Sequence, residues 1–357
     1  MVDEAGAVMV NGRFLTRPAT GVDRFANELL RARYCHQASR PLAAVPAGAP
    51  VRAGSLLQTQ VVGRRNGHAW EQLELPRALA GRGLLNLCNS APAWLEPQLV
   101  VMHDAATAAN PANYSFAFRS WYRVLLAALM KRARVVATVS RFSADELARH
   151  FGRRPRGIEL IGEGGEHILR MAADDSILDR LRLRGRRYVL AVGSRSANKN
   201  FPAVLQAVQS LPQDDVLLVA TGAQGPAVFG RAQALTGPRL VSAGFVSDAE
   251  LRALYENALC FAFPSYYEGF GLPPLEAMCC GCPVVVSDRA SLPEVCGAAA
   301  LYCQPDEPQT LAAAISKLLA SPALRTDLAQ AGRERAAGHG WARAAVQFGQ
   351  IVQAHFG

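Results

Sequence analysis

Long apolar runs are missing from this sequence. No segment approaches the roughly 18 consecutive apolar residues that a membrane-spanning helix needs. The first ten residues, MVDEAGAVMV, carry acidic side chains where a secretory signal peptide carries basic ones, and no long apolar segment follows them. These absences predict a cytoplasmic protein, and they leave peripheral contact with the inner face of the cytoplasmic membrane open.

Metal-binding and nucleic-acid-binding signatures are also missing. The eight cysteines are widely spread, and paired CxxC knuckles with regular spacing do not occur. Cys279, Cys280 and Cys282 stand close together, but they lie where a helix pattern passes into a strand pattern, so packing as small hydrophobic side chains is favoured over zinc binding. No recognisable nucleic-acid-binding module occurs. The sequence therefore predicts no nucleic-acid partner and no metal site among the cysteines.

What the sequence does have is length, apolar residues and positive charge. Its 357 residues exceed one ordinary core, and half are hydrophobic, so two domains of typical size are expected. The formal net charge of +9 favours phosphate-bearing ligands or an acidic membrane face. Basic residues gather in the first half and are interleaved with aromatic and apolar ones from Phe118 to Arg134. This segment fits both a membrane-facing surface and an ordinary solvated face.

Strand and helix patterns alternate through the second half. Unbroken apolar runs typical of buried parallel strands are followed by segments with helical spacing, which predicts a parallel sheet covered on both faces. The first half has similar but less regular pieces. The predicted strands are 85–88, 99–103, 135–139, 188–193, 216–222, 240–246, 259–264 and 283–287. The predicted helices are 21–31, 143–151 with Ser143 as its cap, 201–211, 248–257, 275–281 and 308–320.

The fold class that follows is α/β, with two doubly wound, Rossmann-like domains and a linker between Gly162 and Asp175. Ligands of open parallel sheets bind beyond the carboxyl ends of the strands. One segment in such a position is GSRSANKN, from Gly193 to Asn200. Its glycine permits a tight turn, and Lys199 can reach back over the strand end toward the charge of a phosphate.

A second segment in such a position is YYEGFGLPPLEAM, residues 266–278. Gly269 and Gly271 permit close backbone approach, and the two prolines suit the first turn of a helix whose amides would bind phosphate. Glu268 and Glu276 flank this anion site. Carboxylates in these positions make sense as hydrogen-bond acceptors for hydroxyls at the two ends of a longer molecule, and a nucleotide sugar has that form.

This segment resembles the E-x7-E motif of retaining glycosyltransferases with the GT-B fold, specifically glycosyltransferase family four. Two further segments, WEQ at 70–72 and CN at 88–89, resemble the corresponding segments of bacterial mannosyltransferases that extend lipid-linked saccharides. The resemblance implies two parallel sheets facing each other across a cleft, with an acceptor-binding domain at 1–165, a nucleotide-sugar-binding domain at 166–340, and a helix at 341–357 that crosses back to the first domain. Other matching segments are TGVDRF (20–25), HAWEQLELP (68–76), LLNLCNSAP (84–92), VMHD (101–104), TVSRFS (138–143) and GSRSANKN (193–200).

The resemblance also implies roles for single residues. Lys199 binds the diphosphate, Glu268 lies near the donor sugar, and Glu276 accepts hydrogen bonds from the ribose hydroxyls. His103 lies beside the sugar and completes the catalytic set with Glu268 and Lys199. Ser194 departs from the arginine that many members have after the first glycine, and Arg195 offers a cation nearby. The further donor-binding residues are Gly21, Ser140, Gly193, Ser194, Arg195, Phe270, Gly271 and Leu272.

Two of these residues also have plain structural interpretations. Glu276 can serve only to cap its helix, and His103 can be a hydrogen-bonded core histidine.

The implied reaction moves a hexose to a saccharide acceptor with retention of configuration. GDP-mannose is the favoured donor, and a polyprenyl-diphosphate-linked saccharide is the favoured acceptor, in bacterial surface polysaccharide synthesis. No DxD-like acidic pair stands in a convincing metal position, so catalysis without a metal or other cofactor is expected. The alternatives are a UDP-glucose-type hexosyltransferase and a non-catalytic nucleotide-sugar-binding scaffold. A UDP-sugar epimerase shares the two-domain fold, but its signature is not the GFGLPPLEAM loop.

Overall fold

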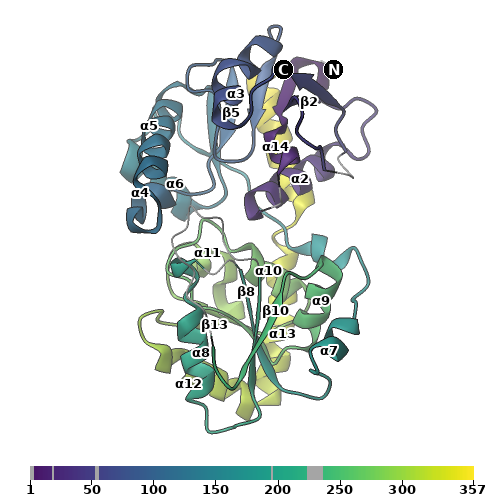
Figure 1. Cartoon of the computed structure of the whole chain (residues 1–357), viewed down its shortest axis with the longest axis vertical. Helices are drawn as coiled ribbons and strands as arrows, with labels where there is room; N and C mark the ends of the chain where they lie inside the picture. Colours follow the sequence, from purple (N-terminus) through teal and green to yellow (C-terminus); the bar gives the residue numbers. More distant parts are fainter. Residues whose placement is uncertain (1–3, 18–19, 53–55, 194–195, 223–235) are drawn as a thin grey trace. The chain divides into compact units, whose positions relative to one another are not determined.

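The structure is a computed structural model that describes residues 4–17, 20–52, 56–193, 196–222 and 236–357. The chain forms two compact units, which are described separately (Figure 1). Unit 1 is built from residues of 1–109, 119–163 and 341–357, and unit 2 from residues of 110–118 and 164–340.

Unit 1 is organised around a parallel sheet with strand order β3-β2-β1-β4-β5-β6-β7. The order reverses direction between β1 and β4, and doubly wound sheets bind ligands beside the carboxyl ends of strands at such a point. Its strands are β1 (Val8–Asn11), β2 (Leu42–Pro46), β3 (Thr59–Val62), β4 (Gly83–Asn86), β5 (Gln98–Val101), β6 (Val135–Thr138) and β7 (Glu159–Leu160).

The helices of unit 1 include the last helix of the described chain, α14 (Trp341–Phe356). It runs beside α2 (Gly21–Tyr34) in Figure 1, and the rings of Phe25 and Trp341 lie 6.0 Å apart. The other helical segments are α1 (Glu4–Ala7), η1 (Gly12–Thr16), α3 (Gly67–Leu73), η2 (Leu75–Ala78), α4 (Ala106–Ala109), α5 (Phe116–Arg132) and α6 (Arg141–Phe151), of which α5 begins in the stretch assigned to unit 2.

Unit 2 has a second parallel sheet, with strand order β10-β9-β8-β11-β12-β13. The order reverses between β8 and β11. Apolar residues of the strands, α8 and α12 form its buried core, as the unbroken apolar runs predict. The strands are β8 (Tyr188–Val192), β9 (Leu217–Thr221), β10 (Leu240–Gly244), β11 (Cys260–Phe263), β12 (Val284–Ser287) and β13 (Ala300–Cys303).

The helical segments of unit 2 cover both faces of this sheet. None of the described helices in either unit combines the length and the apolar character required to span a bilayer. The segments are η3 (Pro111–Asn113), η4 (Glu166–Leu169), α7 (Ser176–Arg180), η5 (Ala197–Lys199), α8 (Phe201–Gln209), α9 (Asp248–Asn257), α10 (Leu272–Cys279), α11 (Leu292–Cys296), η6 (Gly297–Ala299), α12 (Pro308–Ala320) and α13 (Pro322–Ala337).

One predicted helix cap is wrong. The sequence favours Ser143 as the N-cap of the helix at 143–151, but α6 begins at Arg141 and its N-cap is Ser140, whose hydroxyl accepts a hydrogen bond from the Ser143 amide at 3.0 Å. The Ser143 hydroxyl donates to the His103 carbonyl at 2.8 Å instead. The Ser143 side chain, which the local sequence pattern assigns to helix capping, therefore makes a tertiary contact instead.

Candidate active site

A lysine–glutamate ion pair occupies the carboxyl ends of neighbouring strands in unit 2. Lys199 ends η5, which follows β8, and Glu268 follows β11. The Lys199 ammonium lies 2.7 and 2.9 Å from the two carboxylate oxygens of Glu268, and it stacks over the Phe263 ring at 4.7 Å. Both side chains are largely but not fully buried, at 16% and 12% exposure. The structure thus brings two predicted site residues into direct contact.

Backbone donors follow directly after this pair. Gly271, the N-cap of α10, has φ 114° and ψ 50°, a conformation that favours glycine. Within the described residues, the amides of Phe270, Gly271 and Leu272 donate no hydrogen bond. The Ser291 hydroxyl holds the loop from the other side, because its oxygen lies 2.9 and 2.6 Å from the carbonyl oxygens of Glu268 and Phe270, which share its single proton. A fixed loop with available N–H groups at a helix start suits an anion.

Two glycines, Gly193 and Gly222, lie beside Lys199 at the strand ends. Gly193 directly follows β8, and its amide donates to the Thr221 carbonyl at the end of β9. A Cβ on Gly222 would lie 2.1 Å from the Gly193 carbonyl oxygen, so only glycine fits at 222. The predicted donor-binding residues Ser194 and Arg195 lie outside the described residues.

Glu276 is held in the interior by two side chains that the sequence analysis did not single out. His167 Nε2 lies 2.8 Å from Glu276 Oε1, and the Tyr255 hydroxyl donates to Oε2 at 3.3 Å. Burial, followed by the nearby Glu276 charge, raises the pKa of Tyr255 well above its ordinary value, so its hydroxyl stays protonated. Glu276 is the fifth residue of α10 and is not its cap. His167 stands in the predicted linker, where a buried histidine has no local signal.

The predicted residues of unit 1 fall on two adjacent strand ends and one helix start. His103 follows β5 and is 5% exposed. Its Nε2 donates to the Leu87 carbonyl at 2.9 Å, and its Nδ1 lies 3.7 Å from Glu163. Ser140 lies nearby through Ser143, which bonds to both residues. This His103 geometry agrees with the core-histidine interpretation, and its role beside the sugar stays a prediction.

Gly21, the other predicted residue of unit 1, begins α2. A Cβ built on Gly21 would meet nothing within 4 Å. The described neighbours of this residue therefore give no steric reason for glycine.

Unit 1 also contains a buried polar cluster that the residue-level predictions did not include. Its centre is Glu71, which is fully buried on α3 and accepts hydrogen bonds from Asn11 (2.8 Å), Ser90 (2.9 Å) and Arg13 (3.0 Å). His68 Nδ1 lies 3.2 Å from the same carboxylate. Burial opposes ionisation of Glu71, but the hydrogen bonds from His68 and Asn11 and the Arg13 charge hold its pKa below the ordinary value.

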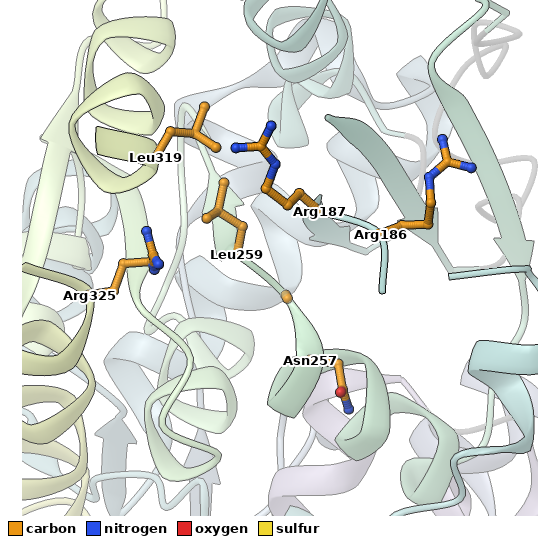
Figure 2. A pocket seen from close by; sticks show the side chains of 7 residues that line it. Arg186, Arg187, Asn257, Leu259, Leu319 and Arg325 are labelled. Carbon is orange, nitrogen blue, oxygen red and sulfur yellow. The ribbon is translucent and has the colours of Figure 1, made fainter. Parts of the chain in front are cut away.

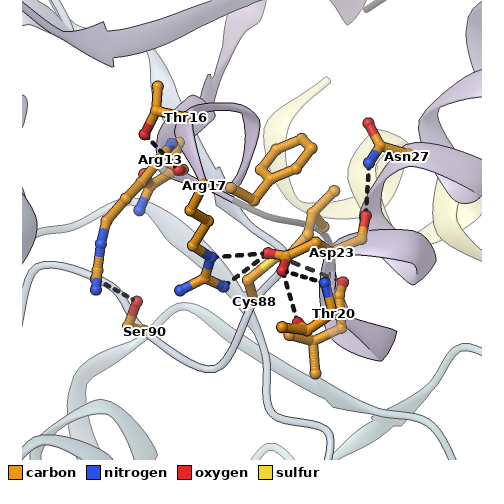
Figure 3. Close-up of polar contacts among 12 residues, drawn as sticks. Arg13, Thr16, Arg17, Thr20, Asp23, Asn27, Cys88 and Ser90 are labelled. Carbon is orange, nitrogen blue, oxygen red and sulfur yellow. Dashed lines mark hydrogen bonds and ion pairs between the residues drawn. The ribbon is translucent and has the colours of Figure 1, made fainter. Parts of the chain in front are cut away.

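A second carboxylate of unit 1 fixes another arginine beside this cluster. Arg17 donates through Nε and Nη2 to Asp23 at 3.0 and 2.7 Å, and Asp23 also caps α2 through Thr20 (Figure 3). The arginines 13 and 17 both line a small cavity beside Cys88 and Ser90. The matching WEQ and CN segments were the only sequence signal for this place, because they contain Glu71 and Cys88–Asn89.

A larger hollow of unit 2 lies away from the predicted residues. It has a volume of about 200 Å³ and is lined by Arg187, Leu259 and Arg325 among others (Figure 2). Arg187 and Leu259 precede β8 and β11. The hollow is therefore at the amino ends of the strands, opposite to Lys199 and Glu268, and its described lining residues include no acid or nucleophile suited to group transfer.

Among the residues that the structure describes, metal-ligating side chains do not gather in either unit. Over the described ranges, no three His, Cys, Asp or Glu residues are grouped so that they could hold a metal ion. Cys282 is buried, and burial raises the pKa of its thiol well above the ordinary value.

Comparison with known proteins identifies the family. Residues 176–335 match the family model described as Glycosyl transferases group 1. The chain is 30% identical over 266 residues to the O-antigen chain mannosyltransferase B of Escherichia coli, covering 72% of this chain and 70% of that protein. It is 29% identical over 261 residues to the serotype-specific mannosyltransferase WbdA of Escherichia coli, covering 69% of this chain and 32% of WbdA.

A solved structure gives the same fold at low sequence identity. HepE of Anabaena, in complex with UDP-glucose, superimposes with a TM-score of 0.73 at 17% identity, covering 97% of this chain and 99% of that one. Two parallel-sheet, Rossmann-like units agree with the predicted α/β class. From its relatives and its fold, this chain belongs to the group 1 glycosyl transferases, and it is a hexosyltransferase of the GT-B type that resembles bacterial mannosyltransferases.

Proposed function

We propose that this glycosyltransferase transfers mannose from GDP-mannose to a saccharide acceptor, with retention of anomeric configuration and without a metal ion. The relatives named O-antigen and serotype-specific mannosyltransferases support the choice of sugar and a role in surface polysaccharide synthesis. The observation that carries the proposal is the Lys199–Glu268 pair at the strand ends, next to the available amides of Phe270, Gly271 and Leu272.

In this proposal the donor diphosphate lies between Lys199 and the start of α10. The ammonium group has three N–H donors, and two suffice for the contacts with Glu268, so a third is available for a phosphate oxygen. The amides at the helix start supply further donors, and the helix dipole favours negative charge there. Together they stabilise the charge that grows on the diphosphate as it leaves.

Glu276 binds the ribose in the same proposal. A carboxylate oxygen has two lone pairs, so each oxygen can accept a second hydrogen bond beside the one from His167 or Tyr255. Because both oxygens are already fixed by buried partners, the carboxylate needs no reordering when the ribose hydroxyls arrive.

The reaction breaks the bond between the anomeric carbon and the phosphate oxygen. The acceptor hydroxyl oxygen forms a new bond to that carbon from the same face, and its proton passes to the departing phosphate oxygen. The products are a nucleoside diphosphate and the extended saccharide. Glu268 holds hydroxyls of the donor sugar and stabilises positive charge at the anomeric carbon.

Donor hydrolysis in the absence of acceptor tests this proposal. We expect the purified protein to release GDP from GDP-mannose slowly, with EDTA causing no loss, and Glu268→Ala to abolish the release while the fold is retained. Asp215→Asn, which removes an exposed acid of the same unit paired with Arg187, is the matched control and should leave the rate unchanged. Release of free mannose with inverted configuration, observed by NMR, or loss of activity in EDTA would contradict retention or metal independence.

UDP-glucose is the second candidate donor. The structure of HepE was solved with that compound, and its fold covers nearly the whole of this chain. A thermal-shift comparison of GDP and UDP decides between the two, because a ligand raises the melting temperature according to its affinity. A shift with both nucleotides but no hydrolysis or transfer of any hexose would support a non-catalytic binding scaffold instead.

A polyprenyl-diphosphate-linked acceptor is the third part of the proposal. On α5, Leu125, Leu126 and Leu129 are buried in the core, while Phe116 and Val124 are exposed at 74% and 67%. Exposed Arg123, Lys131 and Arg132 lie on the same helix. Exposed apolar residues among basic ones suit an anionic membrane surface. The protein should sediment together with anionic liposomes at moderate salt, and its absence from the liposome pellet would rule out this membrane contact.

A further inference from the structure

The polar cluster around Glu71 has features that a purely structural network does not need. Arg13 makes all its side-chain hydrogen bonds within the described residues through Nη1, to Glu71, His68 and Ser90. Its Nε and Nη2 donors therefore remain available. Arg17 uses Nε and Nη2 on Asp23 and keeps Nη1 available within the same residues. Both guanidinium groups are oriented by buried carboxylates and line one cavity.

The cavity is polar, small and balanced in charge. Its volume is about 10 Å³, which admits one water-sized group such as a hydroxyl. Two arginines face two buried carboxylates, Glu71 and Asp23, so no net positive charge remains to attract a phosphate. Burial raises the pKa of the Cys88 thiol well above its ordinary value, so this wall of the cavity is uncharged as well.

An aromatic side chain lies beside the cluster. The Trp121 ring is 5.5 Å from the His68 ring at an interplanar angle of 62°, and His68 contacts both Arg13 and Glu71. Trp121 is 38% exposed. A sugar ring presents apolar C–H groups on its faces and hydroxyls at its edge, so it matches an exposed indole next to oriented guanidinium donors.

We propose that unit 1 binds an uncharged hexose residue of the acceptor at this place, with its ring against Trp121 and one hydroxyl in the cavity between Arg13 and Arg17. The site lies beside the carboxyl ends of β1 and β4, where the strand order reverses and where such sheets bind ligands. The inference deepens the proposed function, because it rests on a saccharide being the acceptor. It assigns acceptor recognition to residues that no predicted donor-binding role uses.

Ligand-observed NMR and calorimetry with simple glycosides test this site. The probes are the methyl glycosides of mannose, galactose and N-acetylglucosamine, with mannose 6-phosphate as the charged comparison. We expect at least one uncharged glycoside to bind the wild-type chain, and Trp121→Ala to weaken that binding about tenfold. Trp94→Ala is the matched control, because Trp94 is 74% exposed in the same unit and stacks only on Arg132 among the described residues.

Arg13→Lys tests the polar half of the site. It keeps the charge but loses the planar fork, so affinity for the uncharged glycoside should also fall about tenfold. If this variant does not fold, Trp121→Ala alone decides, since its side chain is partly exposed. The inference is overturned if no uncharged glycoside binds, if Trp121→Ala binds as the wild type does, or if mannose 6-phosphate binds more tightly than every uncharged glycoside.

The same variants separate this inference from the proposed function. Neither tryptophan has a predicted donor-binding role, so the thermal shift with GDP should be equal in the wild type, Trp121→Ala and Trp94→Ala. Absence of donor binding and hydrolysis in the wild type would overturn the proposed function, while glycoside binding that depends on Trp121 would still stand. If donor hydrolysis is normal but the wild type and Trp121→Ala bind the glycoside equally well, only the inference about the acceptor site is overturned.

Discussion

In each unit a basic residue follows the strand at which the strand order reverses, Arg13 after β1 and Lys199 after β8, and it pairs with a glutamate, but the surroundings of the two pairs differ. In unit 1, Glu71 is fully buried and has four hydrogen-bonding neighbours around its carboxylate. In unit 2, Lys199 and Glu268 are each other's principal partner and remain partly exposed. The carboxylate of Glu71 is enclosed by its partners, although Arg13 keeps donors available within the described residues, whereas the Glu268 carboxylate has one principal partner and stands beside available amides.

This difference bears on what each site can do. A closed network holds its side chains in one geometry whether or not a ligand is present, which suits recognition of an invariant shape. A sparse ion pair beside available amides can exchange partners when a charged ligand arrives, which suits a diphosphate whose charge changes during reaction. The contrast also predicts that substitution of Glu71 affects mainly stability and that substitution of Lys199 or Glu268 affects mainly catalysis.

Lys199→Met should show the largest effect. It removes the cation that offsets the leaving diphosphate, and removal of one such group costs about a 1,000-fold loss of kcat in comparable sites. The melting temperature should also fall, because the variant leaves the largely buried Glu268 carboxylate without its principal partner. Steady-state kinetics with GDP-mannose measure the loss. Lys317→Met, on the exposed side of α12 in the same unit, should retain full activity; equal rates in the two variants would remove Lys199 from the mechanism.

His167→Ala should give the next largest effect. It tests the contrast within unit 2, because Glu276 is a buried, hydrogen-bonded acid like Glu71 of unit 1. The variant leaves a buried carboxylate with only the longer bond from Tyr255, so the free energy of unfolding should fall by about 3 kcal/mol. Tyr255→Phe, which removes only a hydroxyl, should cost about 1 kcal/mol.

His167→Gln separates positioning from packing, because the amide restores an N–H donor toward Glu276. Chemical denaturation measures the stabilities and calorimetry measures GDP affinity. We expect the glutamine variant to recover GDP affinity relative to alanine. If alanine and glutamine bind GDP equally well, His167 has no positioning role for the ribose-binding carboxylate.

Glu71→Gln should give a smaller, pH-dependent effect. The pKa of Glu71 lies below its ordinary value of 4.5 in the folded protein, so the ionised carboxylate contributes stability above that pH. This contribution is lost as the pH falls through the folded-state pKa. The wild type should therefore lose stability more steeply than Glu71→Gln does as the pH falls below about 5. Denaturation curves across this range decide, with exposed Glu159→Gln of β7 as the control expected to follow the wild type.

Gly21→Ala should have the smallest effect on stability. A Cβ at this position meets nothing within 4 Å, and alanine is the better helix former, so the free energy of unfolding should change by no more than about 1 kcal/mol. Donor hydrolysis should nevertheless fall if a loop at Gly21 approaches the diphosphate as the family resemblance implies. Gly162→Ala, whose Cβ would also find space, is the control. Full activity of Gly21→Ala would refute that role.

Sequence pattern predicted unit 2 better than unit 1. The helices Asp248–Asn257 and Pro308–Ala320 have the predicted bounds, and the strands of that unit differ by one or two residues at their ends, except that β13 was not foreseen. In unit 1, β1, β2, β3 and the two-residue β7 were missed as well. β3 has the sequence TQVV and is mostly exposed, so it lacks the apolar pattern of a buried strand. The apolar runs of β1 and β2 are so short that their length does not distinguish a strand from part of a helix.

The candidate site divides in the same way. The sequence placed Glu268 and Lys199 at the same edge of the sheet, because each follows a strand, although it did not predict the ion pair between them. His167 and Tyr255 could not be placed in this way, since their contact with Glu276 joins a 3-10 turn and two helices over separations of up to 109 residues. The Glu71 cluster likewise depends on side chains from β1, α3 and the loop after β4, whose proximity only the tertiary fold creates.

The placement of α14 affects how the protein is made. The ribosome completes all of unit 2 before it makes the helix that unit 1 packs against α2, and at typical synthesis rates this interval is on the order of ten seconds. During that time the apolar side of α2, including Phe25, lacks the cover that Trp341 later provides. The first-made unit is therefore the last to be finished, and a nascent chain at this stage presents an apolar surface to chaperones.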